Sequence, residues 1–458
     1  MIKSKIYNTH FYLDGKGEIL KENDYFKIIS ENLITLKVEI PKESLIFWPN
    51  REGELLESNN INKVLSSYNI EEASICYPST ASMLFFMIFN KKENQGVVIF
   101  SKADIEGKIS LFSLTKEEDK SFLKLQSKGL DLKILSYRAS SFDLLVDEFI
   151  KKEKINTILP SRKNNFSYQV QLGFFTPYGE HSVPLDKGFL VSVDIAKLMR
   201  KYLGNNNIIH MFAYHGSHDS NYPQYFPSPL LGGENQLKKA IEEIHQQKQR
   251  CSLYMNARLC AVENVELFSK LYKSIVLDEN NKKVIETYYD RDFYVMDPLS
   301  EEWRAILVER ALYLKELGVD IIQLDQVAGR AAIGPIGKKW GEGYRLLIEE
   351  IEKLNLEVWI QGINEIYPAN RFELCFRYPN ILLDGTIRGG HPFGVSYPLI
   401  PKLLQNQNFI IPIGSKSLLN QVDKHSVTVD LEHQLGGLSI YSSSYMNSLI
   451  EILKSQIK

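Results

Sequence analysis

From about residue 165 to its C-terminus, the chain alternates short apolar segments with amphipathic ones. Eight of the apolar segments have the length and composition of buried strands. They cover residues 168–175, 208–214, 251–257, 320–325, 357–363, 381–385, 409–414 and 437–442. Repeated strand–helix units over about 290 residues predict a (β/α)₈ TIM barrel in this part of the chain.

The segments between these strands carry helix signals. Residues 235–249 have apolar side chains at helical spacing, and residues 300–318 begin with Ser300, a good N-cap, and end at Gly318, a good stop. A doubly wound open sheet is the rival architecture. It is less favoured, because neither a G-x-G-x-x-G motif nor a P-loop follows any of the predicted strands.

Before residue 150 the pattern is different. Short apolar runs alternate with polar or glycine-containing turns such as "NKKENQG", which is typical of a β-sandwich-like module. Residues 142–153 look helical and close this part. We therefore expect an N-terminal module over residues 1–150, without catalytic residues of its own, and a barrel over residues 151–458.

Composition excludes several classes of function. The net charge of −2 and the pI of about 6.5 offer no basic field for nucleic acid. The four cysteines are scattered without a CxxC pair, which indicates neither a zinc site nor a disulfide framework. The N-terminus lacks the apolar core of a signal peptide, and no apolar run is long enough to span a membrane. We expect a cytoplasmic protein.

Two carboxylates follow consecutive predicted strands. Asp325 ends the apolar segment "GVDIIQLD", and Glu365 comes just after "LEVWIQGI". In a TIM barrel such positions share one pocket at the C-terminal ends of the strands. The pair is suited to retaining glycoside hydrolysis, in which one carboxylate attacks and the other donates a proton, and no cofactor is needed. Alternatively, Asp325 caps a helix and Glu365 pairs with a surface lysine.

Further polar and aromatic residues follow other strands. The loop of residues 214–225 gathers Tyr214, His215, His218 and Asp219, which can stack on sugar rings and bind hydroxyls. The alternatives are a loop held by its own hydrogen bonds and a weak H-x-x-H-D metal site without a third ligand cluster, so we predict no metal.

Arg258 is the most ambiguous of these candidates. It follows the third predicted strand. Three roles are open for it: it pairs with Asp325 and keeps that carboxylate ionised, it clamps a substrate, or it forms a structural ion pair. The remaining candidates for substrate binding lie at the ends of the third, fourth and sixth predicted strands or in the segments that follow them: Asn256, Gln326, Trp340, Asp384, Arg388 and His391.

Several segments together resemble a known family. They are "HGSHDSNYPQYFPSPLLGGENQLKKAIEEIHQQ", "LYMNARL", "DFYVMDPLSEEWRAILVERALYLKELGVDIIQLDQV" and "WIQGINEIY". Over about residues 165–395 the chain resembles a bacterial glycoside-hydrolase-like family of undefined activity. That family is related to the endo-α-N-acetylgalactosaminidases and more remotely to the α-amylase superfamily. The resemblance implies that Asp325 is the nucleophile, that Glu365 is the acid/base, and that the substrate is an α-linked carbohydrate.

The sequence thus predicts a retaining O-glycoside hydrolase acting on an oligosaccharide or glycoconjugate. Two alternatives stay open. One is a transglycosylase, which uses the same residues with a different acceptor. The other is a non-catalytic carbohydrate-binding or glycan-assembly protein, favoured by the absence of an acid in the predicted seventh strand, "NFIIPIGSKS".

Overall fold

The computed structural model describes most of the chain up to residue 373 and short segments beyond it. The described residues are 2–6, 8–22, 25–67, 69–101, 106–155, 165–173, 183, 185–216, 219–288, 290–373, 380–381, 387–388, 395–397, 399–404, 408–412, 426–430, 450–451 and 454.

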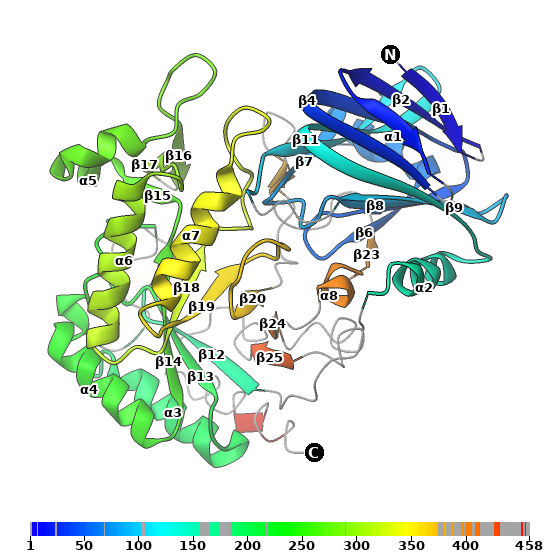
Figure 1. Cartoon of the computed structure of the whole chain (residues 1–458). Coiled ribbons are helices and arrows are strands. Elements are labelled where there is room, and N and C mark those ends of the chain that lie inside the picture. The colour runs from blue at the N-terminus through cyan, green and yellow to red at the C-terminus, as the bar shows by residue number, and fades with distance from the viewer. Residues whose placement is uncertain are drawn as a thin grey trace.

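Eight parallel strands close into a barrel (Figure 1). In order around the barrel they are β12 (Asn165–Gln171), β13 (Ile208–Phe212), β14 (Arg250–Asn256), β18 (Ile321–Asp325), β19 (Glu357–Gln361), β20 (Arg371–Glu373), β24 (Asn408–Pro412) and β25 (Ser426–Asp430). The pairing of β25 with β12 closes the ring. The predicted (β/α)₈ barrel is therefore confirmed.

The helices cover the outside of the barrel between successive strands (Figure 1). Those described are α3 (Leu190–Leu203), α4 (Gly233–Gln246), α6 (Glu301–Glu316) and α7 (Trp340–Glu352). The short helix α8 (Leu399–Leu403) lies beside the N-terminal module instead, and the backbone N of its Ile400 donates to Glu52 (Figure 1). Ser300 caps α6 by accepting a hydrogen bond from the backbone N of Trp303, and Gly318 follows its end with φ of +102°. Both signals were read correctly from the sequence.

Two predicted strands were wrong. The sixth barrel strand is β20, whereas residues 380–381 belong to a hairpin of β21 (Asn380–Ile381) and β22 (Ile387–Arg388). The eighth is β25 rather than residues 437–442, which lie outside the described residues. Since β20 has only three residues, two of them charged, its sequence lacks the apolar run by which a buried strand is recognised.

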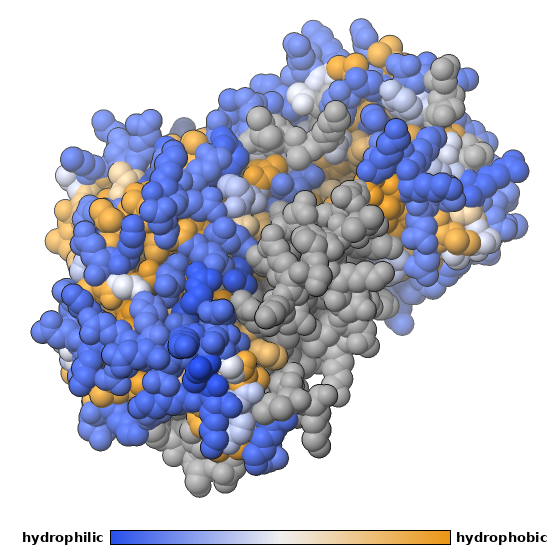
Figure 2. All heavy atoms as spheres, turned by 60° about the horizontal axis from the view of Figure 1, so that its bottom comes forward, coloured by the Kyte–Doolittle hydropathy of each residue, from blue (hydrophilic) through white to orange (hydrophobic). Residues whose placement is uncertain are grey.

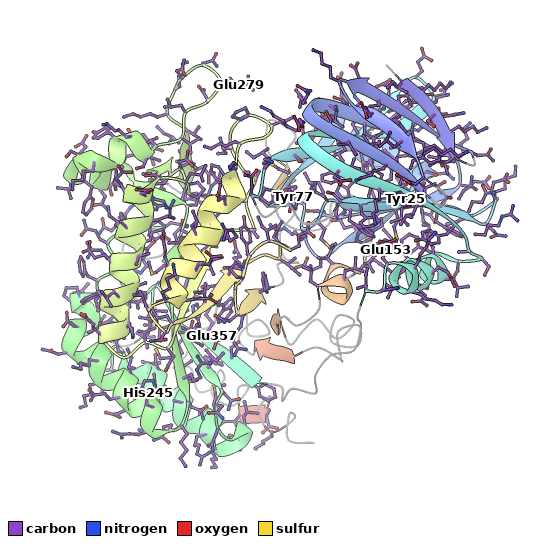
Figure 3. The ribbon with its side chains drawn as sticks, viewed as in Figure 1. Tyr25, Tyr77, Glu153, His245, Glu279 and Glu357 are labelled. Atoms are coloured by element: carbon purple, nitrogen blue, oxygen red, sulfur yellow. The ribbon has the colours of Figure 1, made fainter. Side chains whose placement is uncertain are left out.

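Ion pairs close the lower end of the barrel, where the strands begin. Glu357, labelled in Figure 3, accepts a hydrogen bond of 2.6 Å from Arg250 and also pairs with Arg371. These three residues open three different strands. The charges at this end of the barrel thus neutralise one another, and the catalytic residues are expected at the opposite end.

The described side chains in the middle of the barrel include polar groups without charge. His210 lies 3.0 Å from the Ser252 hydroxyl, and its ring centroid is 5.0 Å from that of Trp359. Burial lowers the pKa of His210 to about 3, so the imidazole is neutral at ordinary pH.

The N-terminal module is one antiparallel sheet folded into a sandwich-like shape. Its elements are β1 (Ile2–Ile6), β2 (Thr9–Gly15), β3 (Glu18–Lys21), β4 (Tyr25–Ile40), β5 (Ser44–Trp48), β6 (Glu54–Glu57), α1 (Ser58–Ser67), β7 (Glu72–Tyr77), β8 (Phe85–Asn90), β9 (Gln95–Ser101), β10 (Ser110–Glu117), β11 (Lys120–Arg138) and α2 (Phe142–Lys152). The long strand β11 pairs with β10 before a bulge at Gly129 and with β9 after it. The bulge lets one strand run through both layers.

An additional small sheet is inserted between β14 and α6. It consists of β15 (Leu259–Ala261), β16 (Ile285–Tyr288) and β17 (Arg291–Val295), with α5 (Val262–Leu267) and a 3₁₀ helix (Ser269–Ser274) between its first two strands. This sheet stands beside the upper end of the barrel (Figure 1).

The outer surface of the barrel is mixed in character. Figure 2 shows hydrophilic residues over most of the barrel side in view, with separate hydrophobic areas between them. Leu230 and Leu267 are among the exposed apolar side chains, at 62% and 72% exposure. In the part of the chain that the structure describes, no helix is both long and apolar enough to cross a membrane.

The module rests on the C-terminal ends of the fourth and fifth barrel strands. Gly341, in the first turn of α7, donates a backbone hydrogen bond of 2.9 Å to Gly107 of the module. A Cβ on Gly341 would lie 2.5 Å from Ile366 Cδ1 and 2.6 Å from Pro78 Cγ. Tyr77, at the end of β7, lies on the same side of the module, between it and the barrel (Figure 3). The two backbones thus approach closely only because both positions are glycine.

We predict that Gly341→Ala lowers the free energy of unfolding by about 1–3 kcal/mol, since the added methyl overpacks this contact. Thermal and urea unfolding measure the change. The matched control is Glu342→Ala on the same helix turn, whose side chain is partly exposed. Equal stability of the two variants would show that the glycine contact is not needed.

Candidate active site

Asp325 is the best-supported carboxylate of the site. It is the last residue of β18 and is only 6% exposed. One oxygen accepts a hydrogen bond of 2.8 Å from the backbone N of Gln326. The other accepts bonds from the Tyr254 hydroxyl at 2.8 Å and the Asn256 amide at 3.4 Å. Three donors from two adjacent strand ends compensate the burial of a charge here.

A second buried carboxylate lies nearby. Asp219 is 6% exposed and follows β13 in a backbone conformation with φ of +53°. When Asp219 is ionised, its carboxylate accepts a hydrogen bond of 3.3 Å from Tyr222, whose hydroxyl lies 3.0 Å from that of Tyr254. Burial raises the pKa of Asp219 to about 6, although Tyr222 and Arg330 act in the opposite direction.

The predicted aromatic loop surrounds His215 with tyrosines. The His215 ring is stacked on Tyr254 at 6.3 Å with an interplanar angle of 6°, and the rings of Tyr214, Tyr222 and Tyr225 lie 5.1–5.9 Å away. His215 is partly exposed, whereas Tyr214 has no exposed surface. Of the two, only His215 has exposed surface, although both of its ring nitrogens are buried, and the Tyr214 ring packs against it.

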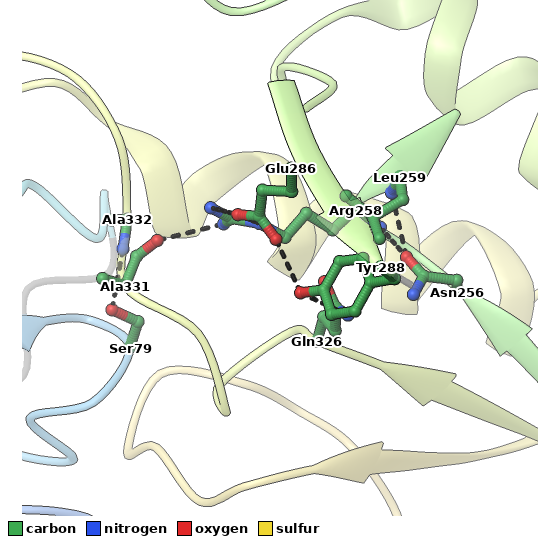
Figure 4. A network of polar contacts seen from close by, with 9 residues as sticks. All are labelled: Ser79, Asn256, Arg258, Leu259, Glu286, Tyr288, Gln326, Ala331 and Ala332. Atoms are coloured by element: carbon green, nitrogen blue, oxygen red, sulfur yellow. Dashed lines mark hydrogen bonds and ion pairs between the residues drawn. The ribbon is translucent and has the colours of Figure 1, made fainter. Parts of the chain in front are cut away.

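Arg258 does not serve as the cation for Asp325, so that expectation was wrong. Its guanidinium donates to Glu286 at 2.9 Å and to the backbone oxygen of Ala331 at 3.0 Å, as Figure 4 shows. It also lies 5.6 Å over the ring of Trp340. Arg258 and Trp340 are both almost completely buried. Arg258 and Glu286 thus form a structural ion pair. Trp340 is better placed to support Arg258 than to contact a sugar.

Gln326 follows Asp325, and its side chain leads to Tyr288 and Arg330. Gln326 is buried with φ of +62°, a costly conformation for a residue other than glycine. Its side-chain oxygen has no partner among the described residues, while its nitrogen lies 3.5 Å from the Tyr288 hydroxyl. The guanidinium of Arg330 lies 5.4 Å over the Tyr288 ring. Within the described residues Arg330 has no hydrogen bond or ion pair, so it is available to a ligand.

Glu365 lies where the barrel meets the module. Its backbone N donates to Ser82 at 3.2 Å, and its carboxylate accepts a long bond of 3.4 Å from the backbone N of Leu84. Neither contact joins it to the partners of Asp325. The proposal that the two carboxylates face one pocket therefore stays a prediction.

The other predicted residues are placed as follows. Asn256 is fully buried, and its side-chain oxygen accepts two backbone bonds of 2.9 Å while its nitrogen reaches Asp325. His218, Asp384 and His391 lie outside the described residues. Arg388 is described only as part of the β22 backbone, which pairs with Asn380.

Several residues of the site were missed by sequence reasoning. Tyr254 could have been found, because strand alternation places it on the same face as Asn256. Arg330 follows Asp325 by five residues in one loop, which is a weaker signal. Glu286 and Tyr288 had no signal, because the inserted sheet that carries them was not predicted.

A metal site is not apparent in the described part of the chain. No group of three His, Cys, Asp or Glu side chains there could hold an ion. The arrangement around Asp325 instead offers one carboxylate, several hydroxyls and the Arg330 guanidinium, which is suited to a polyhydroxylated ligand.

Comparisons with known proteins agree with this fold. Residues 187–351 match the model of DUF6259, a domain of unknown function. No curated protein matches the sequence. An α-N-acetylgalactosaminidase of Bifidobacterium bifidum, NagBb, in complex with Gal-NHAc-DNJ, has a similar structure with a TM-score of 0.63 and 8% identity. The similarity covers 99% of this chain and 92% of that one.

Two α-galactosidases are also similar. TtGalA of Thermus thermophilus has a TM-score of 0.52 and 11% identity, over 81% of this chain and 73% of that one. AgaA of Geobacillus stearothermophilus, of family GH36, has a TM-score of 0.53 and 9% identity, over 97% and 67%. The chain thus has a glycoside-hydrolase-like fold. These structures give no support to the more remote link with α-amylases.

We predict that Glu286→Gln lowers the free energy of unfolding by about 3–5 kcal/mol, because it leaves the Arg258 charge buried without its partner. Denaturant unfolding measures this loss. The double variant Arg258→Met, Glu286→Leu should recover most of it.

The control is Glu309→Gln, which removes an exposed partner of Arg310 and should change stability by less than about 1 kcal/mol. A loss of the same small size in Glu286→Gln would contradict a structural role for the buried pair.

Proposed function

We propose that the protein is a retaining glycoside hydrolase that cleaves an α-linked sugar of the galactose or N-acetylgalactosamine type. The observation that carries the proposal is the buried Asp325, held by three donors at the end of a barrel strand. Similarity to two α-galactosidases and an α-N-acetylgalactosaminidase supports the substrate class. No cofactor takes part, and a cytoplasmic enzyme of this kind would process imported oligosaccharides or glycan precursors.

Asp325 is the nucleophile in this mechanism. Its carboxylate attacks the anomeric carbon while the bond from that carbon to the leaving oxygen breaks, which forms a covalent glycosyl ester. Tyr254 and Asn256 share one of its oxygens, and the Gln326 backbone holds the other. Because these donors are already oriented, the carboxylate needs little rearrangement before attack.

Glu365 is the acid/base. It gives a proton to the leaving oxygen in the first step and takes one from the attacking water in the second, when the ester with Asp325 breaks. Its place at the module boundary means that the module helps to position it, through the backbone of Leu84. Asp384, which follows the sixth strand in the sequence, is the second candidate for this role.

Sugar hydroxyls would be bound by the polar groups around Asp325. His215 offers a partly exposed ring in front of Tyr254, and Gln326 offers a buried oxygen without a partner among the described residues. Arg330 offers a guanidinium that has no hydrogen bond or ion pair among the described residues. These three groups come from the loops after β13 and β18, so they can surround one ring.

The contact of Glu365 with Leu84 also favours a second candidate function. If that contact keeps the carboxylate away from Asp325, the site binds carbohydrate without cleaving it. A protein of this kind would bind α-galactosides with unchanged affinity in Asp325→Asn and would release no product. Calorimetry and a chromogenic assay on the same preparation distinguish the two functions.

We predict that the wild-type chain hydrolyses an aryl α-galactoside or α-N-acetylgalactosaminide and that Asp325→Asn reduces kcat at least about a thousandfold, since no covalent intermediate forms. Release of the phenol measures the rate. The matched control is Asp320→Asn, at the other end of the same strand, where Asp320 pairs with His245. An active Asp325→Asn variant would disprove the nucleophile.

Replacement of Glu365 should have a different effect. In Glu365→Ala, substrates with good leaving groups should still be attacked, because a phenolate needs no proton, and the second step should be slow. Azide should then restore turnover by replacing the base-activated water and give a glycosyl azide. Equal loss with good and poor leaving groups, without azide rescue, would move the acid/base role to Asp384, and Asp384→Ala should then show the rescue.

A further inference from the structure

A chain of hydroxyl groups joins the two buried carboxylates. Asp219 lies 3.3 Å from the Tyr222 hydroxyl, the two tyrosine hydroxyls are 3.0 Å apart, and Tyr254 lies 2.8 Å from Asp325. All four side chains are buried. The chain runs from the loop after β13 through β14 to β18, so it crosses three neighbouring strand ends.

The number of protons on this chain decides what it does. Three contacts between oxygen atoms need three protons if each is to be a hydrogen bond. Tyr222 and Tyr254 supply two, because burial raises the pKa of both hydroxyls well above 10. The third proton must lie on one of the two carboxyl groups.

Asp219 is the better place for that proton. Asp325 accepts further hydrogen bonds from the Gln326 backbone and the Asn256 amide, which favour its ionised form. Burial dominates at Asp219 and raises its pKa to about 6. With a proton on Asp219, every donor on the chain points toward Asp325: Asp219 donates to Tyr222, Tyr222 to Tyr254, and Tyr254 to Asp325.

Titratable groups from several neighbouring elements surround Asp219 and the hydroxyl chain. Arg330, on the loop after Asp325, lowers the pKa of Asp219, but burial outweighs it. The other titratable groups of the described residues that face the hydroxyl chain are His215, Tyr222, Tyr225, Tyr254 and Asp325, which come from its own loop, β14 and β18.

We propose that Asp219 is a positioning residue that holds a proton and, through Tyr222 and Tyr254, directs a hydrogen bond onto the attacking oxygen of Asp325. This inference rests on the proposed function of Asp325. When Asp219 loses its proton, Tyr222 turns its own proton toward Asp219, and Tyr254 loses the donor that strengthens its bond to Asp325. A second negative charge also appears beside the nucleophile.

The first test does not depend on activity. Since the folded pKa of Asp219 lies above its ordinary value of 3.8, its contribution to stability is present below about pH 4 and is lost as the pH rises through about 6. Asp219→Asn has no such proton. The Tm of the wild type minus that of Asp219→Asn should therefore fall as the pH rises from 4 to 7, and a constant difference would overturn the assignment of the proton.

The second test reads the effect on Asp325. Tyr222→Phe should lower kcat roughly tenfold and leave KM within about twofold, because Tyr222 acts through Tyr254 rather than on the substrate. The matched control is Tyr367→Phe. It removes a buried hydroxyl that donates to Pro78 at the module boundary and does not belong to the hydroxyl chain between Asp219 and Asp325. Equal kinetics of the two variants would overturn the positioning role while leaving the proposed function standing.

The pH profile separates positioning from a merely structural role. In the wild type kcat/KM should fall as the pH rises through about 6, and Asp219→Asn should lack this fall. An unchanged profile in Asp219→Asn overturns the inference even if its activity is low. Lack of turnover by the wild type on every α-galactoside and α-N-acetylgalactosaminide tried overturns the proposed function, and the positioning role falls with it.

Discussion

The buried ion pair of Arg258 and Glu286 connects the parts from which the site is built. Arg258 follows the third barrel strand, and Glu286 comes from the inserted sheet. Arg258 also donates to the backbone of Ala331, whose neighbour Ala332 donates to Ser79 of the module. Taking two charges out of water costs several kcal/mol each, so the pair is favourable only while all of these partners are in place. The same network therefore makes the loop after Asp325 depend on both the barrel and the module.

This dependence explains why a charge is tolerated at the end of an apolar strand. The strand β18 supplies only the position of Asp325, and its neighbours supply the donors. Gln326 adopts a strained backbone conformation that places its N–H on Asp325, and the strain is supported by the loop that Arg258 holds. A network that fixes the loop thus also fixes the carboxylate, without any direct contact between Arg258 and Asp325.

The sequence predicted the architecture better than it predicted individual strands. Long apolar strands and capped helices carry strong periodic signals, and elements such as β18 and α6 were found from them. The strand β20 was missed because pairing with β19 and β24, rather than its own composition, keeps its three residues extended. The inserted sheet was missed for the same reason, since its strands are short and half-exposed and depend on packing against the barrel.

For the side chains of the site, too, the sequence predicted position better than pairing. Position after a strand was enough to predict that Asp325, Asp219 and Asn256 lie together, because the barrel fold brings all strand ends to one rim. Pairing was not predictable in this way, because Arg258 takes its acidic partner, Glu286, from a sheet without a sequence signal. The direction in which the hydroxyl chain donates its hydrogen bonds is even harder to predict from the sequence, since it depends on which carboxyl group holds one proton. The chemistry of such a site is therefore determined less by which residues follow the strands than by how many protons they share.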